Sequence, residues 1–189
     1  MAILSIRLFG DSILRQQTEP VESVDAEVQK LIVDMIETMH NAEGIGLAAP
    51  QVGRLERLFV VDVSGLKEDM PEDVRDNLPE QPMVFINPEI TWESEEEEEF
   101  EEGCLSIPDI REPVFRPESV QITYQDKNMQ KHSEMVDGIL SRVIQHEYDH
   151  LEGILFTDHI SAFRRTILKR KLMEIARGNT CADYPVQPV

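Results

Sequence analysis

The most restrictive feature of the sequence is a pair of histidines, His146 and His150, with Glu147 directly after the first. Side chains four residues apart project from the same face of an α-helix, one turn from each other. Apolar residues recur at helical spacing through residues 138–153, which predicts a helix with a buried face. Because burying two imidazoles and a carboxylate without partners is costly, any fold of this chain must bring partners to this helix.

Two imidazoles on one helical face can bind the same metal ion, and Glu147 can take a proton from metal-bound water. Two protein ligands hold a divalent ion poorly, so a third is needed. The downstream candidates are Glu152, Asp158, His159 and Glu174. Upstream, Cys104 follows Gly103, where the backbone can come close to a ligand. A thiolate beside two imidazoles suits zinc or ferrous iron, and three protein ligands leave a position open for water, as in catalytic sites.

A third segment, Gly44–Gly53, is rich in small residues that let a backbone approach a substrate closely. Within it, Gln51 offers an amide donor for an oxyanion that develops during a reaction. Alone, this segment indicates only a turn between a helix and a strand. Taken alone, Cys104 likewise indicates a buried small hydrophobic residue.

Taken together, the three segments resemble the motifs of the peptide deformylases, G-φ-G-φ-A-A-x-Q, E-G-C-φ-S and H-E-x-x-H, where φ is apolar. They stand in that order as Gly44–Gln51, Glu102–Ser106 and His146–His150, and all the defining positions match. The resemblance extends from Met1 to about Arg177, which is most of the chain. Three motifs in order are far more specific than H-E-x-x-H alone.

The resemblance implies a metal-dependent hydrolase that removes the N-formyl group from the N-terminal formyl-methionine of newly made polypeptides and releases formate. It implies that Cys104, His146 and His150 bind one divalent metal ion. Ferrous iron is the natural metal that the resemblance suggests, and zinc or nickel can occupy such a site. Glu147 would be the general base when metal-bound water attacks the formyl carbon, and then the general acid toward the leaving amine.

The same resemblance implies the residues that stabilise the oxyanion and bind the substrate. Gln51 and the N–H of Leu105 would donate hydrogen bonds to the oxyanion. Other residues would hold the peptide backbone in an extended, strand-like pose or border the methionine pocket. The substrate-binding residues are Ile45, Gly46, Glu102, Gly103, Ile139, Arg142 and Val143, of which Ile45, Ile139, Arg142 and Val143 border the pocket.

Strands predominate in the middle of the chain and helices flank them without regular alternation, which favours an α+β fold. The resemblance implies small antiparallel sheets packed around a central helix that carries the H-E-x-x-H motif. An N-terminal helix is predicted from Asp25, its cap, to near Gly44, and a C-terminal helix from about Ser161 to Arg177. Strands are predicted at Leu58–Val63, at Met83–Ile86 before the Asn87-Pro88 break, and at Val120–Tyr124.

The remaining segments are predicted to be exposed. Ser64–Pro82 indicates a loop or insertion. The acidic run from Glu93 to Glu102 is interpreted as a solvated edge or turn rather than a weak cation site, since its spacing is unlike an EF-hand loop. Residues 1–178 are expected to form a single catalytic domain, followed by a flexible C-terminal tail at 179–189.

Composition narrows the expected partners and compartment. The net charge of −19 disfavours DNA and anionic membrane surfaces. No apolar run approaches the ~20 residues that cross a bilayer, and the first residues lack the pattern of a signal peptide. With only two cysteines, no disulfide scaffold is expected, so the predicted location is the reducing cytoplasm.

The predicted C-terminal helix holds six of the eighteen basic residues, and two interpretations of them stay open. They are Arg164, Arg165, Lys169, Arg170, Lys171 and Arg177. On an enzyme of nascent chains they could contact ribosomal RNA. Alternatively, these charges simply offset the acidic body of the protein.

Two other functions remain as alternatives at this point. The first is a metallopeptidase that cleaves peptide bonds. The second is a non-catalytic metal-binding protein, which would need a fourth protein ligand. Candidates for that ligand are Cys181, His40, His132 and His159, which show no paired spacing.

Overall fold

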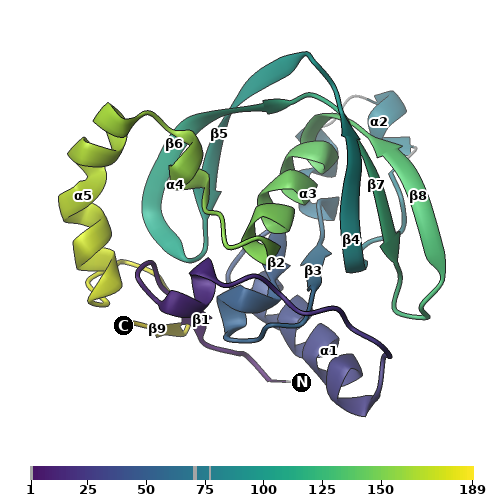
Figure 1. Ribbon diagram of the computed structural model, residues 1–189, viewed down its shortest axis with the longest axis horizontal. Helices are drawn as coiled ribbons and strands as arrows, with labels where there is room; N and C mark the ends of the chain where they lie inside the picture. The colour runs from purple at the N-terminus through teal and green to yellow at the C-terminus, as the bar shows by residue number, and fades with distance from the viewer. Residues whose placement is uncertain (1, 70–71, 77) are drawn as a thin grey trace.

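The computed structural model describes residues 2–69, 72–76 and 78–189, and it combines helices with antiparallel sheets (Figure 1). The helices are α1 (Ala26–Asn41), α2 (Glu72–Asp76), α3 (Gly138–Leu151), α4 (Phe156–His159) and α5 (Ala162–Ala176), with shorter helical turns η1 (Ser12–Arg15), η2 (Ala49–Val52) and η3 (Ser64–Asp69). The strands are β1 (Ile6–Arg7), β2 (Gly46–Ala48), β3 (Leu58–Val61), β4 (Met83–Glu93), β5 (Glu97–Cys104), β6 (Ile107–Pro117), β7 (Val120–Gln125), β8 (Lys131–Val136) and β9 (Val186–Gln187). The predicted combination of helices with antiparallel sheets is confirmed.

A five-stranded antiparallel sheet, in the order β2-β3-β4-β7-β8, separates two layers of the core. Successive residues of β3 point to opposite faces, as in any strand. Phe59 and Val61 pack in the cluster that includes α3, whereas Leu58 and Val60 pack in the cluster that includes α1. The two helices therefore cover opposite faces of the sheet.

The hairpin of β5 and β6 lies on the other side of α3 from this sheet (Figure 1). Two side chains of α3 hydrogen-bond to β6, since Arg142 donates to the carbonyl of Val114 and Gln145 to that of Pro117. A third core cluster joins β6 to α4 and α5. Helix α3 is thus enclosed between two sheets, which explains why both of its histidines are buried.

The ends of α1 follow from local chemistry. The Asp25 carboxylate accepts hydrogen bonds from two backbone N–H groups of the first turn, which confirms the predicted cap. After the helix, Glu43 rather than Gly44 takes the left-handed conformation, with φ of 51°. At position 44, a Cβ would lie 2.8 Å from Cδ1 of Leu105, so a larger residue there would require that side chain to shift.

The strand predicted over Met83–Ile86 does not stop at the Asn87-Pro88 break but continues to Glu93. A register shift lies between Ile86 and Glu89, where β4 pairs with β7. Asn87 adopts φ of 50°, and its side chain bonds both the N–H and the carbonyl of Val21 at 2.8 Å. The expected break is therefore a bulge that the sheet absorbs.

The acidic run contributes a strand, β5, which pairs with β6 from Glu97 opposite Pro117 to Cys104 opposite Ile107. The segment Ser64–Pro82, predicted as a loop, contains the short helices η3 and α2. Residues 70, 71 and 77 of this segment lie outside the described residues. Neither β6 nor β8 corresponds to a strand that is predicted from the sequence.

Residues 179–189, expected as a flexible tail, return to the body of the protein. Within them, β9 pairs in parallel with β1, with Ile6 opposite Val186. Both strands lie at the lower left of the view in Figure 1. Across the described residues, no helix has the length and apolar character that crossing a membrane requires.

Candidate active site

Two elements bring three potential metal ligands together. Cys104 is the last residue of β5, and His146 and His150 lie one turn apart on α3. One ligand atom from each residue lies within 4.8 Å of the other two, and Cys104 Sγ is 3.3 Å from His150 Nε2. A sulfur and two imidazole nitrogens at this spacing fit one divalent ion and leave it a position open to water.

The charge of Cys104 favours metal binding. Burial raises the pKa of the thiol, but His150 and His146 beside it lower that pKa to about 5. The thiolate is the form that binds metal. Burial alone would lower the pKa of His146, whereas its contacts with Cys104 and Glu102 raise it well above the usual value. A divalent cation can replace the protons that this cluster holds.

A buried carboxylate, Glu102, fixes the orientation of His146. Glu102 Oε2 lies 2.9 Å from His146 Nδ1, so the other ring nitrogen is left for the ligand cluster. Arg116 donates to both oxygens of Glu102, at 2.6 and 3.0 Å, and Arg142 donates to Oε1 at 3.1 Å. Burial would raise the pKa of Glu102, but His146 and Arg116 hold it far below its usual range. Glu102 is therefore ionised at neutral pH.

Glu147 lies on α3 beside the ligands, and burial raises its pKa to about 7 despite the nearby His146 and His150. Its Oε2 is buried and has no hydrogen-bond partner among the described residues. The backbone of β2 passes so close that a Cβ at Gly46 would overlap Oε1 and lie 2.8 Å from Cδ. This carboxyl group can therefore exchange a proton with a small molecule near neutral pH.

The amide of Gln51 is turned toward the cluster. Its Oε1 accepts a hydrogen bond from the N–H of Ala48 at 2.8 Å, which leaves the NH2 group facing inward. Nε2 lies 3.4 Å from Cys104 Sγ and 3.3 Å from Ser106 Oγ. Because both ends of the amide are held, it is a preorganised donor beside the ligand cluster.

These groups meet in a cavity of about 820 Å³. Its walls come from β2, the end of β5, the start of β6, α3 and the C-terminal segment. The strand β2 is at one end of the five-stranded sheet, so one side of its backbone has no strand beside it in the described chain. A cavity of this size that includes a strand edge can accommodate a short extended peptide.

Comparison with known proteins agrees with this geometry. The family model for polypeptide deformylase matches residues 3–166. A peptide deformylase of Salinibacter ruber is 54% identical over 184 residues, which cover 97% of this chain and 94% of that protein. This chain belongs to the polypeptide deformylase family. Members of the family are enzymes that carry out metal-dependent deformylation of nascent chains.

Solved deformylase structures share the fold. A peptide deformylase from Legionella pneumophila, 39% identical, superimposes with a TM-score of 0.80 and covers 93% of this chain and 96% of its own. A peptide deformylase from Synechococcus elongatus, solved in complex with actinonin, is 38% identical with a TM-score of 0.76. That comparison covers 100% of this chain and 92% of the other.

The structure brings the residues that the deformylase motifs predicted to one place. All of them except His150 line the cavity. The lining residues among them are Ile45, Gly46, Gln51, Glu102, Gly103, Cys104, Leu105, Ile139, Arg142, Val143, His146 and Glu147. The ring of His150 is buried behind this surface, with Nε2 toward Cys104.

Two of the predicted substrate-binding residues are largely occupied by other contacts. Both oxygens of Glu102 are bonded to Arg116, Arg142 and His146. The guanidinium of Arg142 donates to Glu102 and to two backbone carbonyls of the β5–β6 hairpin. Both oxygens of Glu102 thus face His146 and the two arginines, and its contact with the substrate stays a prediction.

Sequence reasoning missed three residues of the site. Arg116 holds Glu102 and also donates to Asp149 at 2.7 Å. Ser106 holds Gln51, and the hydroxyl of Tyr184 donates to the carbonyl of Leu105 at 2.8 Å. Arg116 and Tyr184 lie outside the three motifs, and no local pattern in the sequence marks them.

The candidates for a fourth ligand lie elsewhere. His40, His132 and His159 contact Asp62, Asp126 and Asp149 at 2.8, 3.1 and 2.7 Å, respectively. Cys181 is exposed on the cavity wall and is not in the ligand cluster. Within the described residues the cluster thus contains three ligands, which is the arrangement of a catalytic rather than a closed structural site.

Proposed function

We propose that this chain removes the formyl group of N-formyl-methionyl peptides with Cys104, His146 and His150 as metal ligands and Glu147 as the proton-transfer group. The convergence of one thiolate and two imidazoles beside a carboxyl group with an unpartnered oxygen supports these roles most directly. Gln51 adds a donor aimed at the same point. These are the groups that hydrolysis of an amide requires.

When bound, the divalent ion would supply a polarised water and a positive charge beside the formyl oxygen. Glu147 takes a proton from the attacking water, and its pKa near 7 suits it to release the proton again. The NH2 group of Gln51 and the N–H of Leu105 donate to the carbonyl oxygen as it becomes negative. Glu147 then delivers the proton to the nitrogen of the departing amine.

We propose that the peptide lies extended along the free edge of β2, with Ile45 and Gly46 on one side and Gly103 on the other. Backbone hydrogen bonds to a strand edge bind a peptide with little regard to its sequence. The apolar side chains of Ile139 and Val143 on α3, together with Ile45, would border the methionine side chain.

We propose ferrous iron as the natural metal, with zinc or nickel able to occupy the same ligands. One thiolate and two imidazoles form a donor set that suits each of these ions. The cytoplasm is the proposed compartment, because nascent chains are made there and two cysteines in the chain fit reducing conditions.

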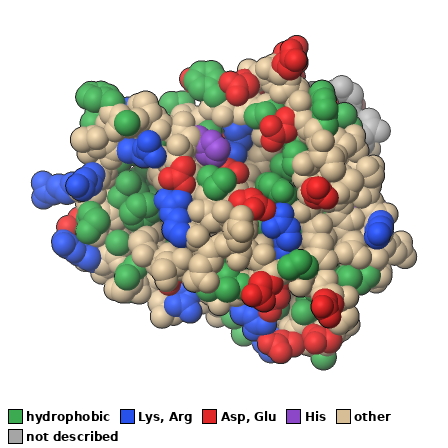
Figure 2. Space-filling view, viewed as in Figure 1, with side chains coloured by type: hydrophobic (Ala, Val, Ile, Leu, Met, Phe, Trp, Pro, Cys, Tyr) green, Lys and Arg blue, Asp and Glu red, His purple; other side chains and the backbone are tan. Residues whose placement is uncertain are grey.

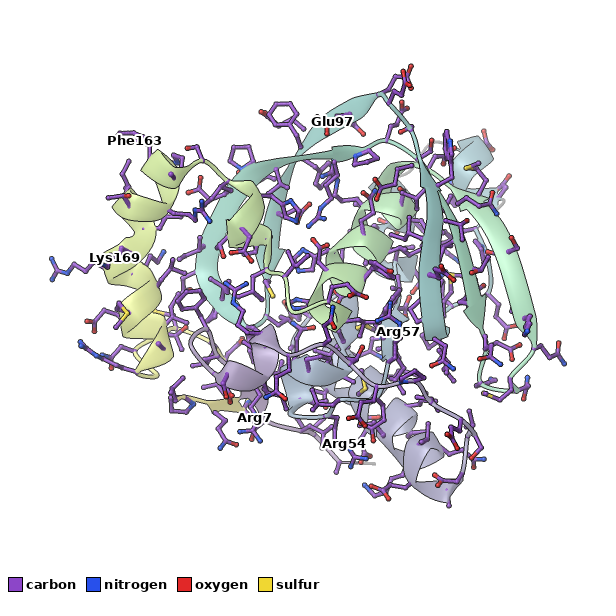
Figure 3. All side chains as sticks on the ribbon, viewed as in Figure 1. Arg7, Arg54, Arg57, Glu97, Phe163 and Lys169 are labelled. Carbon is purple, nitrogen blue, oxygen red and sulfur yellow. The ribbon has the colours of Figure 1, made fainter. Side chains whose placement is uncertain are left out.

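We further propose that residues 1–178 form one catalytic domain with α3 as its central helix, onto which residues 179–189 pack through β9. The basic helix α5 is a candidate contact for the ribosome. Arg164 is bonded to Glu112, but Lys169 projects from the body (Figure 3). Basic side chains also gather at the left edge of Figure 2, where α5 lies in Figure 1. Salt-sensitive co-sedimentation with ribosomes would test this contact.

The proposed reaction is tested with a formyl-methionyl peptide and the same peptide unblocked. Release of formate from the first alone supports deformylation, whereas cleavage of the second alone would establish a metallopeptidase. Glu147→Gln keeps the shape of the side chain but removes its basicity, and it should lower kcat by about 10²–10⁴-fold. The matched control is Glu152→Gln, at the end of the same helix, where Glu152 pairs with Arg57 away from the cavity. Full activity of Glu147→Gln would refute the proposed role.

A further inference from the structure

The segment that follows α5 forms part of the cavity wall. Cys181, Ala182, Asp183 and Tyr184 line the same cavity as the ligand cluster. The three motifs end at His150, so this wall comes from a part of the chain that they do not include.

The segment is held on both sides of Tyr184. On one side, the Asp109 carboxylate accepts hydrogen bonds from the hydroxyl of Thr180 and the N–H of Cys181, each at 3.1 Å. On the other side, the carbonyl of Pro185 accepts from Ile6 at 2.9 Å, where β9 joins β1. Anchors three residues before and one residue after Tyr184 leave its side chain little freedom to move.

The side chain of Tyr184 reaches the turn that follows Cys104. Its ring packs against the core cluster on the α1 side, together with Leu105. Its hydroxyl donates to the Leu105 carbonyl at 2.8 Å, a contact between residues 79 positions apart. Burial raises the pKa of Tyr184 above its usual value, so the hydroxyl keeps its proton at neutral pH.

Three polar groups of the turn at Leu105 and Ser106 have hydrogen-bond partners. The carbonyl of Ser106 accepts from the N–H of Phe9 at 2.8 Å, and its hydroxyl lies 3.3 Å from Gln51 Nε2. Tyr184 secures the remaining carbonyl, that of Leu105. The N–H of Leu105 lies in the peptide plane that it shares with the carbonyl of Cys104, and Cys104 pairs with Ile107 in the hairpin. The carbonyl of Leu105 lies in the next peptide plane, so Tyr184 limits rotation at Leu105 from the other side of this N–H.

We propose that Tyr184 is a positioning residue that holds the Leu105 turn so that its N–H points at the developing oxyanion. The proposal rests on the proposed deformylation, in which the N–H of Leu105 is one of two donors. A donor that is free to rotate must be ordered in each turnover, whereas a fixed donor stabilises the transition state without that cost. Tyr184 therefore acts on kcat through Leu105 and not by contact with the reacting atoms.

The test is Tyr184→Phe, which keeps the ring and its packing and removes only the hydroxyl. We expect kcat for a formyl-methionyl peptide to fall about tenfold, the usual weight of one neutral hydrogen bond, while KM changes less than twofold. Hydrogen exchange of the Leu105 and Ser106 amides should be faster in the variant, and metal content should equal that of the parent. The matched control is Tyr124→Phe, which removes a hydroxyl bonded to Glu134 on β8, outside the cavity, and should leave kcat unchanged.

Three outcomes would overturn the inference. Unchanged kcat and unchanged amide exchange in Tyr184→Phe would show that the hydroxyl does not order the turn. A rise in KM with constant kcat would make Tyr184 a substrate contact instead. An inactive parent enzyme would refute the proposed function itself, and the parent is therefore assayed first in the same experiment.

Discussion

The strongest prediction concerns Glu102→Gln. In the parent protein, Glu102 is 5% exposed, and its two oxygens accept from Arg116, Arg142 and His146. Glutamine keeps the volume but removes the charge, and its NH2 group would face donors where the carboxylate oxygen accepts. Both arginines are also buried, so the substitution leaves their positive charges without the carboxylate between them.

Removing one member of a buried ion pair costs about 3–5 kcal/mol of unfolding free energy, because the remaining charge is left without compensation. Asp149 still pairs with Arg116, which places the expected loss for Glu102→Gln near the lower end of that range. A domain has only about 5–15 kcal/mol in total, so the variant should remain folded but with a clearly lower midpoint of denaturation. Loss of the acceptor for His146 Nδ1 should also weaken metal affinity by about 10–100-fold.

The dependence on pH gives an independent measure. The pKa of Glu102 in the folded protein lies well below its ordinary value of 4.5, so its contribution to stability is complete above that value and declines as the pH falls. Urea denaturation at pH 7 should therefore separate parent and variant most widely, and the difference should shrink below pH 4. The control is Glu99→Gln on the exposed side of the same strand, which should change stability by about 0.5 kcal/mol or less. Equal unfolding free energies of Glu102→Gln and parent at pH 7, with equal metal affinity, would refute this reasoning.

Two further substitutions test the packing around the site and the bulge in β4. Gly46→Ala should lower kcat about 10²-fold while the protein remains folded, because the new Cβ must displace the Glu147 carboxylate. Steady-state kinetics measure this effect, and an unchanged kcat would show that the carboxylate has room to move. Asn87→Ala should cost about 2–3 kcal/mol in urea denaturation, since it removes both bonds to Val21 and puts alanine at φ of 50°. Asn87→Gly tolerates that φ and should lose less, and equal losses in the two variants would contradict the contribution of strain.

The sequence was most informative where function requires a fixed local spacing. The histidines could be placed on one helical face because i and i+4 positions always share one. The cap at Asp25 and the strands β3 and β7 also follow from local patterns. A carboxylate before a helix can accept hydrogen bonds from the first N–H groups, and successive side chains of a strand point to opposite faces of the sheet.

Long-range pairing could not be predicted in the same way. The acidic strand β5 has little apolar alternation, and β6 contains three prolines, at 108, 113 and 117, which usually argue against a strand. Proline is tolerated in β6 because, among the described strands, β6 pairs with β5 alone. On one face of β6, Ile110 and Val114 are buried in the cluster that includes α4 and α5. Neither the pairing partner of β6 nor the burial of its face can be deduced before the fold is known.

The same limit applies to the residues that support the site. Arg116 is 14 residues from Glu102 and 33 from Asp149, and no spacing rule connects them. A sequence shows which side chains could react, but the buried partners that hold them are chosen by the tertiary structure. For Glu102, the motif position gives no sign of the two arginines that surround it.

The pairing of β1 with β9 has a consequence for how the protein folds. Ile6 and Val186 meet across almost the whole chain, so closing that loop carries a large entropic cost and little local structure to offset it. Such contacts form late and are the first to fray. The helix α3 and its sheet are therefore expected to assemble before the wall that contains Tyr184. A chain that has not yet completed this wall would have Cys104, His146 and His150 close together, but its cavity would be open on one side.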